Sequence, residues 1–428
     1  MKELSLNGAV VQTYPLTAAQ RIHFYTVSAC RREELLNIAT GFYIEFADVD
    51  FDTLRECIRD GYEKFESMRL RFTKDEDGSP MSEIVMVRLP GNFNGLYMKV
   101  HHMTMDSTAI MGFYSYVLNL YCYKKFENIE PPKPPKSYLA QLKLDLQYEN
   151  NSLAMERDRK FWLEQLEAPE PIYTPFSPRN RLMELREQMH NPDLRACYGT
   201  GDIEADIKVY DLEDAPSKAL VAFSKEYRIP VASILLLGLR TCFSKFSGGE
   251  KDVSVKNAVA RRGTLLESQS GGTRIHFWPL RTIIEPETSF LDALKIVQAK
   301  ENALLRHANY DPIRYMGETA AHYGCPQGTG YECTTLTYQP VSAASLKGRQ
   351  LPDMNFKSMW YSNGVAMQLI YVTVMHRPTD NGFSFHFEYE KNSVSLDEIE
   401  KLYYYLCRAI FRGIEDPNRT IGEILDWM

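Results

Sequence analysis

Residues 96–107 read Leu-Tyr-Met-Lys-Val-His-His-Met-Thr-Met-Asp-Ser. The apolar run over residues 96–100 predicts a strand that leads directly into the pair His101-His102. After a short turn, apolar side chains recur at three- and four-residue intervals from residue 107 to about 126, which predicts a helix. The histidine pair is therefore expected where a strand gives way to a helix.

The two histidines are expected to have different roles. Adjacent residues of a strand point to opposite faces, so one of His101 and His102 faces a covered core while the other faces outward or into a channel. Asp106 stands where the turn becomes a helix, and a helix N-cap is the simplest explanation for an aspartate at that place. A histidine at a strand end carries no function by itself.

Strands and helices alternate along the whole chain, which is 428 residues long. Such a length exceeds one ordinary core and predicts two domains of about 200 residues each. The segment 168–179 contains four prolines and is the best candidate for a link. We therefore expect two similar α/β (α+β) lobes, an N-terminal lobe of residues 1–175 and a C-terminal lobe of residues 176–428.

Local patterns predict further elements. In the first half we expect a helix over residues 17–29, a helix that Asp52 caps and that ends near Glu66, and a strand at residues 68–72. In the second half we expect strands at 196–210, 253–259 and 274–284, three strands between 331 and 390, and helices at 215–227, 231–247, 288–307 and 396–413.

The net charge of −7 excludes a general field that attracts nucleic acid or an anionic membrane. Basic pairs occur at Arg31-Arg32 and Arg261-Arg262. Charged pairs of this kind are usually solvated, so we predict no function for them. Neither nucleic acid nor a membrane is expected as a partner.

The cysteines form no CxxC pair, and neither they nor the histidines have metal-ligand spacing. We expect reduced, mostly buried thiols and no metal. The N-terminal residues lack a basic region followed by an apolar run, and no stretch reaches the length of a membrane span. The cytosol is the expected compartment. The eight cysteines are at positions 30, 57, 122, 197, 242, 325, 333 and 407.

Six segments occur in the order in which one family has them. They are residues 15–21, 66–72, 101–106, 272–281, 307–312 and 387–389. This order resembles the condensation domains of nonribosomal peptide synthetases, which belong to one superfamily with chloramphenicol acetyltransferase. Residues 101–106 match the HHxxxD motif of that family. Each segment alone is a weak signal, but together they cover nearly the whole chain.

The resemblance implies a fold and a site. Two chloramphenicol acetyltransferase-like lobes would form a V, with the active site in a tunnel between them. His102 would be the catalytic histidine that faces this tunnel, and His101 its structural neighbour. Asp106 would be a buried carboxylate paired with Arg69, which agrees with the need of a buried carboxylate for a cationic partner.

Two positions depart from the family pattern. Ser107 replaces the glycine that usually follows the motif, and a side chain there narrows the approach to His102. His276 stands where many members have asparagine. It is a secondary candidate for a hydrogen bond at the tunnel, although an ordinary strand histidine explains it slightly better.

The resemblance also implies an activity. Condensation domains join an acyl group, held as a thioester on one carrier protein, to the amine of an aminoacyl group on another. Both substrates arrive on phosphopantetheine arms, so no permanently bound cofactor is expected. His102 would act as a general base or position the amine, and the residues do not choose between these roles.

We therefore predict a free-standing condensation enzyme whose partners are acyl or peptidyl carrier proteins and a small acyl acceptor, an amine or a hydroxyl compound. Two alternatives remain open. One is an acyltransferase of the same superfamily that uses acyl-coenzyme A, and the other is an inactive module that only docks carrier proteins. The donor, the acceptor and the choice between amide and ester cannot be read from the residues.

Overall fold

The computed structural model describes most of the chain. It covers residues 2–426 and 428, apart from positions 7–8, 31, 46–48, 73–80, 91–92, 151, 177–180, 200–202, 341–354, 367, 378–379 and 381. The end of the predicted link, residues 177–179, therefore lies outside the described residues.

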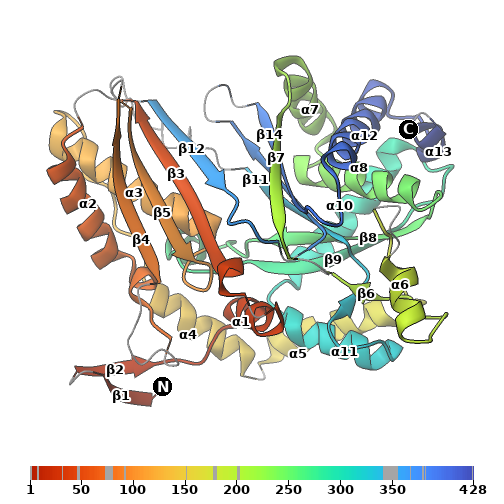
Figure 1. The fold of residues 1–428 in the computed structure, drawn as a ribbon, viewed down its shortest axis with the longest axis horizontal. Helices are drawn as coiled ribbons and strands as arrows, with labels where there is room; N and C mark the ends of the chain where they lie inside the picture. Colours follow the sequence, from red (N-terminus) through yellow and green to blue (C-terminus); the bar gives the residue numbers. More distant parts are fainter. Residues whose placement is uncertain are drawn as a thin grey trace.

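The first lobe is built on a four-stranded antiparallel sheet in the order β12-β3-β5-β4. Helices α2 and α3 cover one face of this sheet (Figure 1). The inward side chains of β5 alternate along the strand, as expected for a sheet with one covered face, and pack against the apolar stripe of α3. The bounds are β3 Asn37–Glu45, β4 Ser82–Leu89, β5 Phe93–His101, α2 Phe51–Lys64 and α3 Ser107–Lys125.

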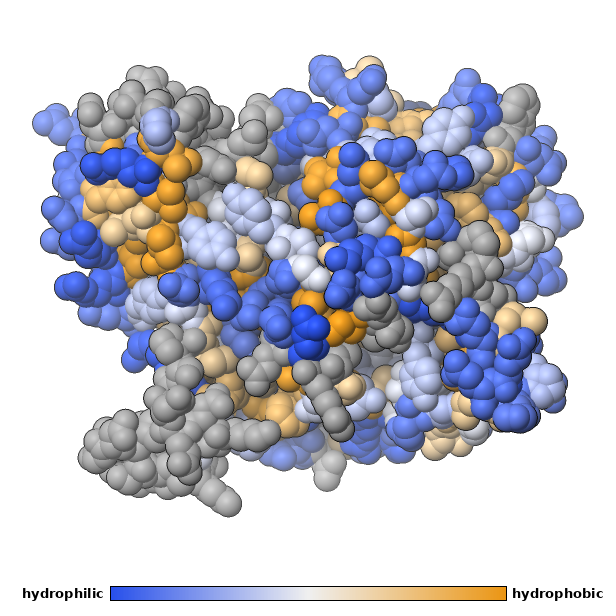
Figure 2. Space-filling model, viewed as in Figure 1, coloured by the Kyte–Doolittle hydropathy of each residue, from blue (hydrophilic) through white to orange (hydrophobic). Residues whose placement is uncertain are grey.

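The other face of this sheet carries apolar side chains that are exposed. Figure 2 shows apolar residues gathered over the four-stranded sheet between charged ones. On the edge strand β4 these include Val85 and Leu89, and on the opposite edge strand Met359 and Tyr361.

The second lobe contains a six-stranded mixed sheet in the order β7-β14-β13-β11-β8-β9. Only the pairs β8–β11 and β11–β13 are parallel. Helix α8 is buried over residues 233–244 because it is enclosed between this sheet, α10 and α12. The bounds are β7 Ala205–Asp211, β8 Asp252–Val259, β9 His276–Ile283, β11 Thr334–Gln339, β13 Ile370–His376, β14 Phe383–Glu390, α7 Asp214–Tyr227, α8 Val231–Phe246, α10 Phe290–Arg306 and α12 Leu396–Glu415.

The two lobes exchange elements. Strand β12 (Asn355–Tyr361) comes from the second half of the chain but pairs with β3 of the first sheet. Conversely, Met155 and Trp162 of α5 (Leu153–Glu164) belong to the hydrophobic core of the second lobe. The predicted boundary near residue 175 therefore does not coincide with the division between the two cores.

The remaining elements connect and cover the lobes. Helix α1 (Ala18–Cys30) confirms the predicted helix over residues 17–29, and helix α4 (Tyr138–Glu149) follows α3 along the chain. The others are β1 Lys2–Leu6, β2 Ala9–Thr13, α6 Arg181–Gln188, β6 Cys197–Tyr198, α9 Leu265–Gln269, α11 Pro312–Tyr323, β10 Thr329–Gly330 and α13 Ile421–Asp426, with short 3-10 turns at Glu33–Leu36, Glu66–Arg69 and Gln165–Glu167.

Three local predictions are wrong. Residues 66–69 form a 3-10 turn instead of a strand at 68–72, because the backbone bonds there run locally, from Met68 to Phe65 and from Leu70 to Ser67. Asp50, not Asp52, caps α2, since its side chain accepts from the backbone N–H groups of residues 52 and 53. The region from 331 to 390 contains four longer strands instead of three, because β12 leaves for the other sheet.

The thiol prediction agrees with the structure. Seven cysteines with described side chains are free, and five of these are buried.

Among the described residues, no single helix has the length and apolarity to cross a bilayer. Only α7 and α8 taken together reach that length and apolarity, and a bend of 111° separates them.

Candidate active site

His101 and His102 lie at the end of β5, where the chain turns toward α3. The backbone N–H of His101 donates to Met81 O (2.8 Å), and that of His102 donates to Leu36 O (2.6 Å). The two residues therefore bond to the neighbouring segments on opposite sides of β5. The His101 ring lies near the Phe72 ring, with 5.9 Å between centroids.

His101 holds the turn in shape. Its Nδ1 accepts from the backbone N–H of Met103 (3.3 Å), and its carbonyl oxygen accepts from the N–H and the hydroxyl of Thr104 (2.9 and 2.8 Å). Burial, together with the nearby His102, lowers the pKa of His101 to about 4. A neutral ring whose Nδ1 is already an acceptor fits the predicted structural role.

His102 is half-buried, and its ring stacks on the ring of His23 from α1. The centroids are 4.1 Å apart and the planes differ by 26°. Burial lowers the pKa of His102 below its ordinary value of 6.5, while a hydrogen bond to its own backbone and the charge of Asp106 act in the opposite direction. The imidazole is therefore a free base at neutral pH.

Asp106 caps α3, as predicted, and it is also the centre of a buried ionic cluster. Its Oδ1 accepts from the backbone N–H of Ala109 (3.0 Å), and its side chain is 2% exposed. The Nη2 of Arg262 donates to both carboxylate oxygens at 2.8 Å, and the backbone N–H of Arg274 donates to Oδ2 at 2.9 Å. These bonds give the buried carboxylate oxygens hydrogen-bond donors from three other residues.

The prediction that Asp106 pairs with Arg69 is wrong. Arg69 ends the 3-10 turn at Glu66–Arg69 and is exposed. Its position is taken by Arg262, whose side chain is only 6% exposed. The requirement for a guanidinium beside Asp106 was predicted correctly, but the second lobe supplies it instead of the first.

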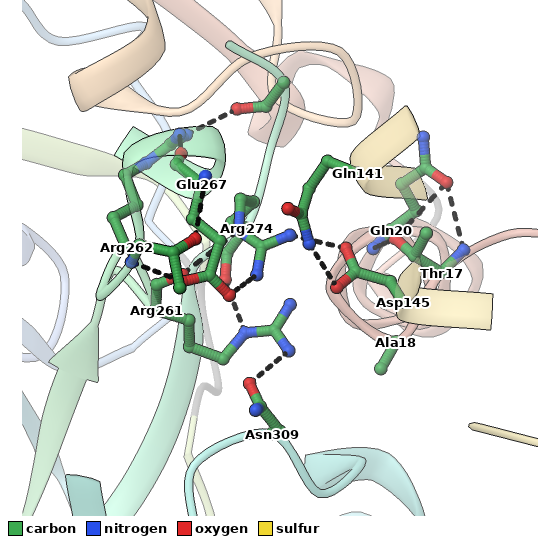
Figure 3. A network of polar contacts seen from close by, with 12 residues as sticks. Thr17, Ala18, Gln20, Gln141, Asp145, Arg261, Arg262, Glu267, Arg274 and Asn309 are labelled. Carbon is green, nitrogen blue, oxygen red and sulfur yellow. Dashed lines mark hydrogen bonds and ion pairs between the residues drawn. The ribbon is translucent and has the colours of Figure 1, made fainter. Parts of the chain in front are cut away.

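Arg262 belongs to the loop between β8 and β9, residues 260–275, which we call the bridging loop. Arg274 of the same loop is 1% exposed and pairs with Asp145 of α4 (2.6 Å) and with Glu267 of the loop itself (2.9 Å). Figure 3 shows how Arg261, Arg262 and Arg274 converge in this cluster. The bridging loop therefore joins α3 and α4 of the first part of the chain to the second sheet.

The path of this loop depends on glycine. Gly272 has a φ of +73°, and a Cβ there would lie 1.9 Å from the Tyr138 ring. Its N–H donates to Ser67 Oγ (3.2 Å), and its carbonyl oxygen accepts from Arg262. Only a residue without a side chain can combine this conformation with this close approach.

The prediction that the pair Arg261-Arg262 is solvated is also wrong. Arg262 pairs with Asp106, and Arg261 Nε donates to the carbonyl oxygen of Arg274 at 2.8 Å. Arg261 has a positive φ of 50°. A positive φ is uncommon for a residue other than glycine, and the sequence alone gave no sign of it at this position.

Helix α1 also contacts the HHxxxD turn. Gln20 Nε2 donates to the carbonyl oxygen of Met103 (3.2 Å). Arg21 holds the helix in place through ion pairs with Glu149 (2.8 Å) and Asp311 (2.7 Å). The segment 15–21 that the sequence singled out therefore supports the HHxxxD turn.

Ser107 and His276 occupy different environments. Ser107 is half-buried and is the first residue of α3, beside the motif as predicted. His276 is fully buried, and its Nδ1 bonds to Ala308 O (2.8 Å). Because the carbonyl oxygen only accepts, Nδ1 carries the proton, and Nε2 is left as a buried nitrogen without a partner. Burial lowers the pKa of His276 well below its ordinary value.

A cavity of about 820 Å³ lies beside α1. Ile22, Tyr25 and Thr26 of α1 line it, whereas the adjacent His23 contacts His102. His102 does not line this cavity, so the predicted tunnel remains a prediction.

The cavity walls come mainly from the second lobe and are largely apolar. They include Phe277 and Leu280 of β9, Ala303 and Leu304 of α10, and Met316 of α11.

Among the residues that the structure describes, no cluster of three or more His, Cys, Asp or Glu side chains could hold a metal ion.

Comparisons with known proteins agree with this geometry. A plipastatin synthase of Bacillus subtilis (strain 168) is 20% identical over 346 residues, or 81% of this chain. Surfactin synthase subunit 1 of the same organism is 20% identical over 96% of the chain. The chain spans 12% of the length of each of these relatives.

Solved structures show the same fold. The first condensation domain of the CDA synthetase has a TM-score of 0.77 at 16% identity, covering 96% of this chain and 98% of that one. VibH, a condensation enzyme of nonribosomal peptide synthesis, has a TM-score of 0.70 at 14% identity, covering 94% and 99%. The predicted chloramphenicol acetyltransferase-like fold is therefore confirmed.

The family model described as "Condensation domain" matches residues 83–426, a range that begins before the HHxxxD motif and includes the bridging loop and the six-stranded sheet. On this match, and on the site geometry above, the chain belongs to the condensation-domain family.

Proposed function

We propose that this chain transfers an acyl group from a phosphopantetheine thioester on a carrier protein to an amine, and that His102 is the residue that handles the proton. Membership of the condensation-domain family supports an acyl-transfer condensation activity. The observation that carries the assignment to His102 is its state: a half-buried imidazole with a lowered pKa, which remains unprotonated at neutral pH.

In the proposed step the acyl group passes from the thioester sulfur to the amine nitrogen, and His102 carries the proton between them. The lone pair of the neutral amine attacks the thioester carbonyl, and His102 takes the proton that the nitrogen loses as the C–N bond forms. The tetrahedral intermediate then expels the thiolate, which receives a proton from His102, so the ring returns to its free-base form. A hydroxyl acceptor would follow the same path and give an ester.

The other residues of the motif would keep His102 in place. His101 accepts from the Met103 N–H and so fixes the turn. Asp106, bonded to Arg262 and to the cap of α3, would shape the site without contact to the substrate. Alignment of the two bound arms could supply a large part of the rate, since fixed geometry replaces a bimolecular encounter.

The identity of the acyl donor is the finer part of this proposal. A neighbouring structure, the starter condensation domain of rhizomide synthetase, was solved with C8-CoA, and another of its structures with C8-CoA and Leu-SNAC. A donor on coenzyme A is therefore the alternative to a carrier-bound donor. Either donor brings its own phosphopantetheine, so we propose no permanently bound cofactor.

The apolar cavity beside α1 is the candidate for the acyl group. Its volume of about 820 Å³ falls within the usual range of small-molecule pockets, which is about 300–1,000 Å³. An acyl chain of the C8 class would bury apolar surface there against α10 and β9.

The test is a transfer assay read by mass spectrometry. The purified chain receives an octanoyl group as a carrier-protein thioester or as C8-CoA, with mixed amines and alcohols. We expect product from the carrier thioester, and we expect His102→Ala to abolish it. The control is His322→Ala, which removes an exposed histidine of α11.

Each outcome decides between the proposals. Product from C8-CoA alone would assign the chain to the small-molecule acyltransferases. Product that His102→Ala does not reduce would overturn the role of His102, and no product from either donor would favour a module that only docks carrier proteins. Because the chain is tested without any attached domain, product formation would also support the predicted free-standing activity.

A further inference from the structure

The ring of His23 is the only described ring that stacks on His102. It projects from α1, its side chain is completely buried, and both of its nitrogens lack a hydrogen-bond partner. His102 Nδ1 is likewise buried and has no partner in another described residue. Two adjacent imidazoles therefore contact each other through their faces and not through hydrogen bonds.

This arrangement costs free energy of folding. A buried polar nitrogen without a partner loses its hydrogen bond to water and gains none in return. A leucine has a similar size and would occupy the same place without that cost. A buried histidine that destabilises the fold beside a reactive group calls for a reason other than packing.

Support for the His102 ring from a second residue is also missing among the described contacts. In most histidine sites a carboxylate or carbonyl accepts from the second ring nitrogen and so fixes the ring plane. No other described residue offers His102 Nδ1 such an acceptor, and the polar support of the ring comes from its own backbone. The planar contact with His23 is the contact from another residue that restrains the orientation of this ring.

We propose that His23 is a positioning residue for the reaction: its ring fixes the plane of His102, and its aromatic face stabilises the imidazolium that forms when His102 takes up a proton. This inference rests on the role of His102 proposed above. A cation over an aromatic face is attracted by the ring, and the attraction is stronger in a dry environment. His23 itself has no exposed surface and would not contact the substrate.

Burial lowers the pKa of both rings, and the charged or titratable groups beside them are His101 and Asp106, of which Asp106 acts against that shift at His102. His101 lies on the same strand end as His102, and Asp106 reaches it from the start of α3 with its charge already paired to Arg262. Burial, and then the adjacent His102 and His101, lower the pKa of His23 well below its ordinary value. His23 therefore remains neutral while His102 is the ring that can accept a proton.

The experiment compares His23→Phe, which retains an aromatic face, with His23→Leu, which does not. The probes are C8-CoA and Leu-SNAC, or the carrier thioester if only that donor is used. We expect His23→Phe to keep kcat within about twofold and His23→Leu to lose about tenfold in kcat with little change in KM, equivalent to about 1.4 kcal/mol. Phe24→Leu, an exposed change in the same helix, is the control.

A second readout does not require turnover. Histidine ring signals of the labelled protein are followed by NMR against pH, and the His102 signal is assigned by its loss in His102→Ala. A tenfold loss of imidazolium stabilisation corresponds to one pH unit, so we expect the His102 midpoint to fall by about one unit in His23→Leu and to change little in His23→Phe. The melting temperature of His23→Leu should be unchanged or higher.

The two readouts separate the possible failures. Unchanged kcat and an unchanged His102 midpoint in His23→Leu would overturn the inference and leave His23 as a core residue. If the midpoint shifts as expected but neither His102→Ala nor His23→Leu affects turnover, the ring contact is real and the proposed function of His102 fails. If His23→Leu does not fold, the inference is judged on His23→Phe, whose loss of kcat would overturn it.

Discussion

Arg262 Nη2 lies 2.8 Å from each carboxylate oxygen of Asp106, although the two residues are 156 positions apart in the sequence. The pair connects the first turn of α3 with the bridging loop between β8 and β9. It therefore joins the HHxxxD turn to the second lobe, so that the shape of the site depends on how the two parts of the chain meet.

The first prediction concerns the stability of this pair. Arg262→Ala leaves the Asp106 carboxylate buried without its cation, and we expect the free energy of unfolding to fall by about 3–5 kcal/mol. Arg69→Ala is the matched control, because Arg69 is exposed and makes no contact with Asp106. Its effect should be within about 0.5 kcal/mol. Denaturant unfolding measures both, and equal losses in the two variants would contradict the assignment.

The second prediction concerns the path of the bridging loop. Gly272→Ala adds a methyl group 1.9 Å from the Tyr138 ring at a φ of +73°, and we expect a loss of about 2–5 kcal/mol from backbone strain and overpacking together. Gly248 has nearly the same φ, +72°, but open space around its Cβ position. Gly248→Ala should therefore cost only the strain, about 1–2 kcal/mol.

Thermal unfolding of both glycine variants checks this difference. A loss in Gly272→Ala no larger than that in Gly248→Ala would mean that Tyr138 moves aside freely. The bridging loop would then not be fixed by this contact.

Local patterns in the sequence were sufficient for α3 and its cap. The apolar spacing over residues 107–126 and the aspartate before it depend only on neighbouring residues, and the helix Ser107–Lys125 with its Asp106 cap follows them closely. The same holds for α7, α8 and α10, whose observed bounds lie within two residues of those predicted.

Long-range contacts could not be predicted in this way. Nothing in the pair Arg261-Arg262 distinguishes a buried partner of Asp106 from a solvated surface pair. Likewise, the alternation in β12 predicts a strand but does not say which sheet receives it, and the periodicity of α1 gives no sign that His23 stacks on His102. These contacts are decided by how distant segments pack, which one sequence does not record.

The third prediction tests the cavity as the site of the acyl group and rests on the proposed function. Ala303 of α10 lines the cavity, and Ala303→Trp would fill part of its volume. We expect octanoyl transfer to fall at least tenfold while acetyl transfer is largely retained, since a short acyl group still fits. Leu305→Trp, at an exposed position of the same helix that does not line the cavity, is the control.

The ratio of octanoyl to acetyl transfer is the measurement. Equal loss with both donors in Ala303→Trp would indicate a general disturbance of α10. An unchanged ratio at full activity would place the acyl group elsewhere.

The fourth prediction concerns the pH dependence of stability. Burial lowers the pKa of His276 well below 6.5, so the folded state stays unprotonated where the unfolded chain takes up a proton. The contribution of His276 to the free energy of unfolding is therefore fully present above pH 6.5. It falls with pH, by about 1 kcal/mol between pH 7.5 and 5.5. His276→Leu lacks this titration, so its stability relative to wild type should rise by about that amount over the same interval.

Glu388 should show the opposite pH dependence of stability. Burial raises the pKa of its carboxyl from 4.5 to about 7, so the folded state binds a proton before the unfolded chain does, and this residue favours folding more strongly as the pH falls from 7.5 to 5.5. Glu388→Gln should therefore lose about 1–2 kcal/mol relative to wild type over that interval. Urea unfolding at both pH values measures the two variants, and parallel pH dependences for His276→Leu and Glu388→Gln would rule out these opposite titrations.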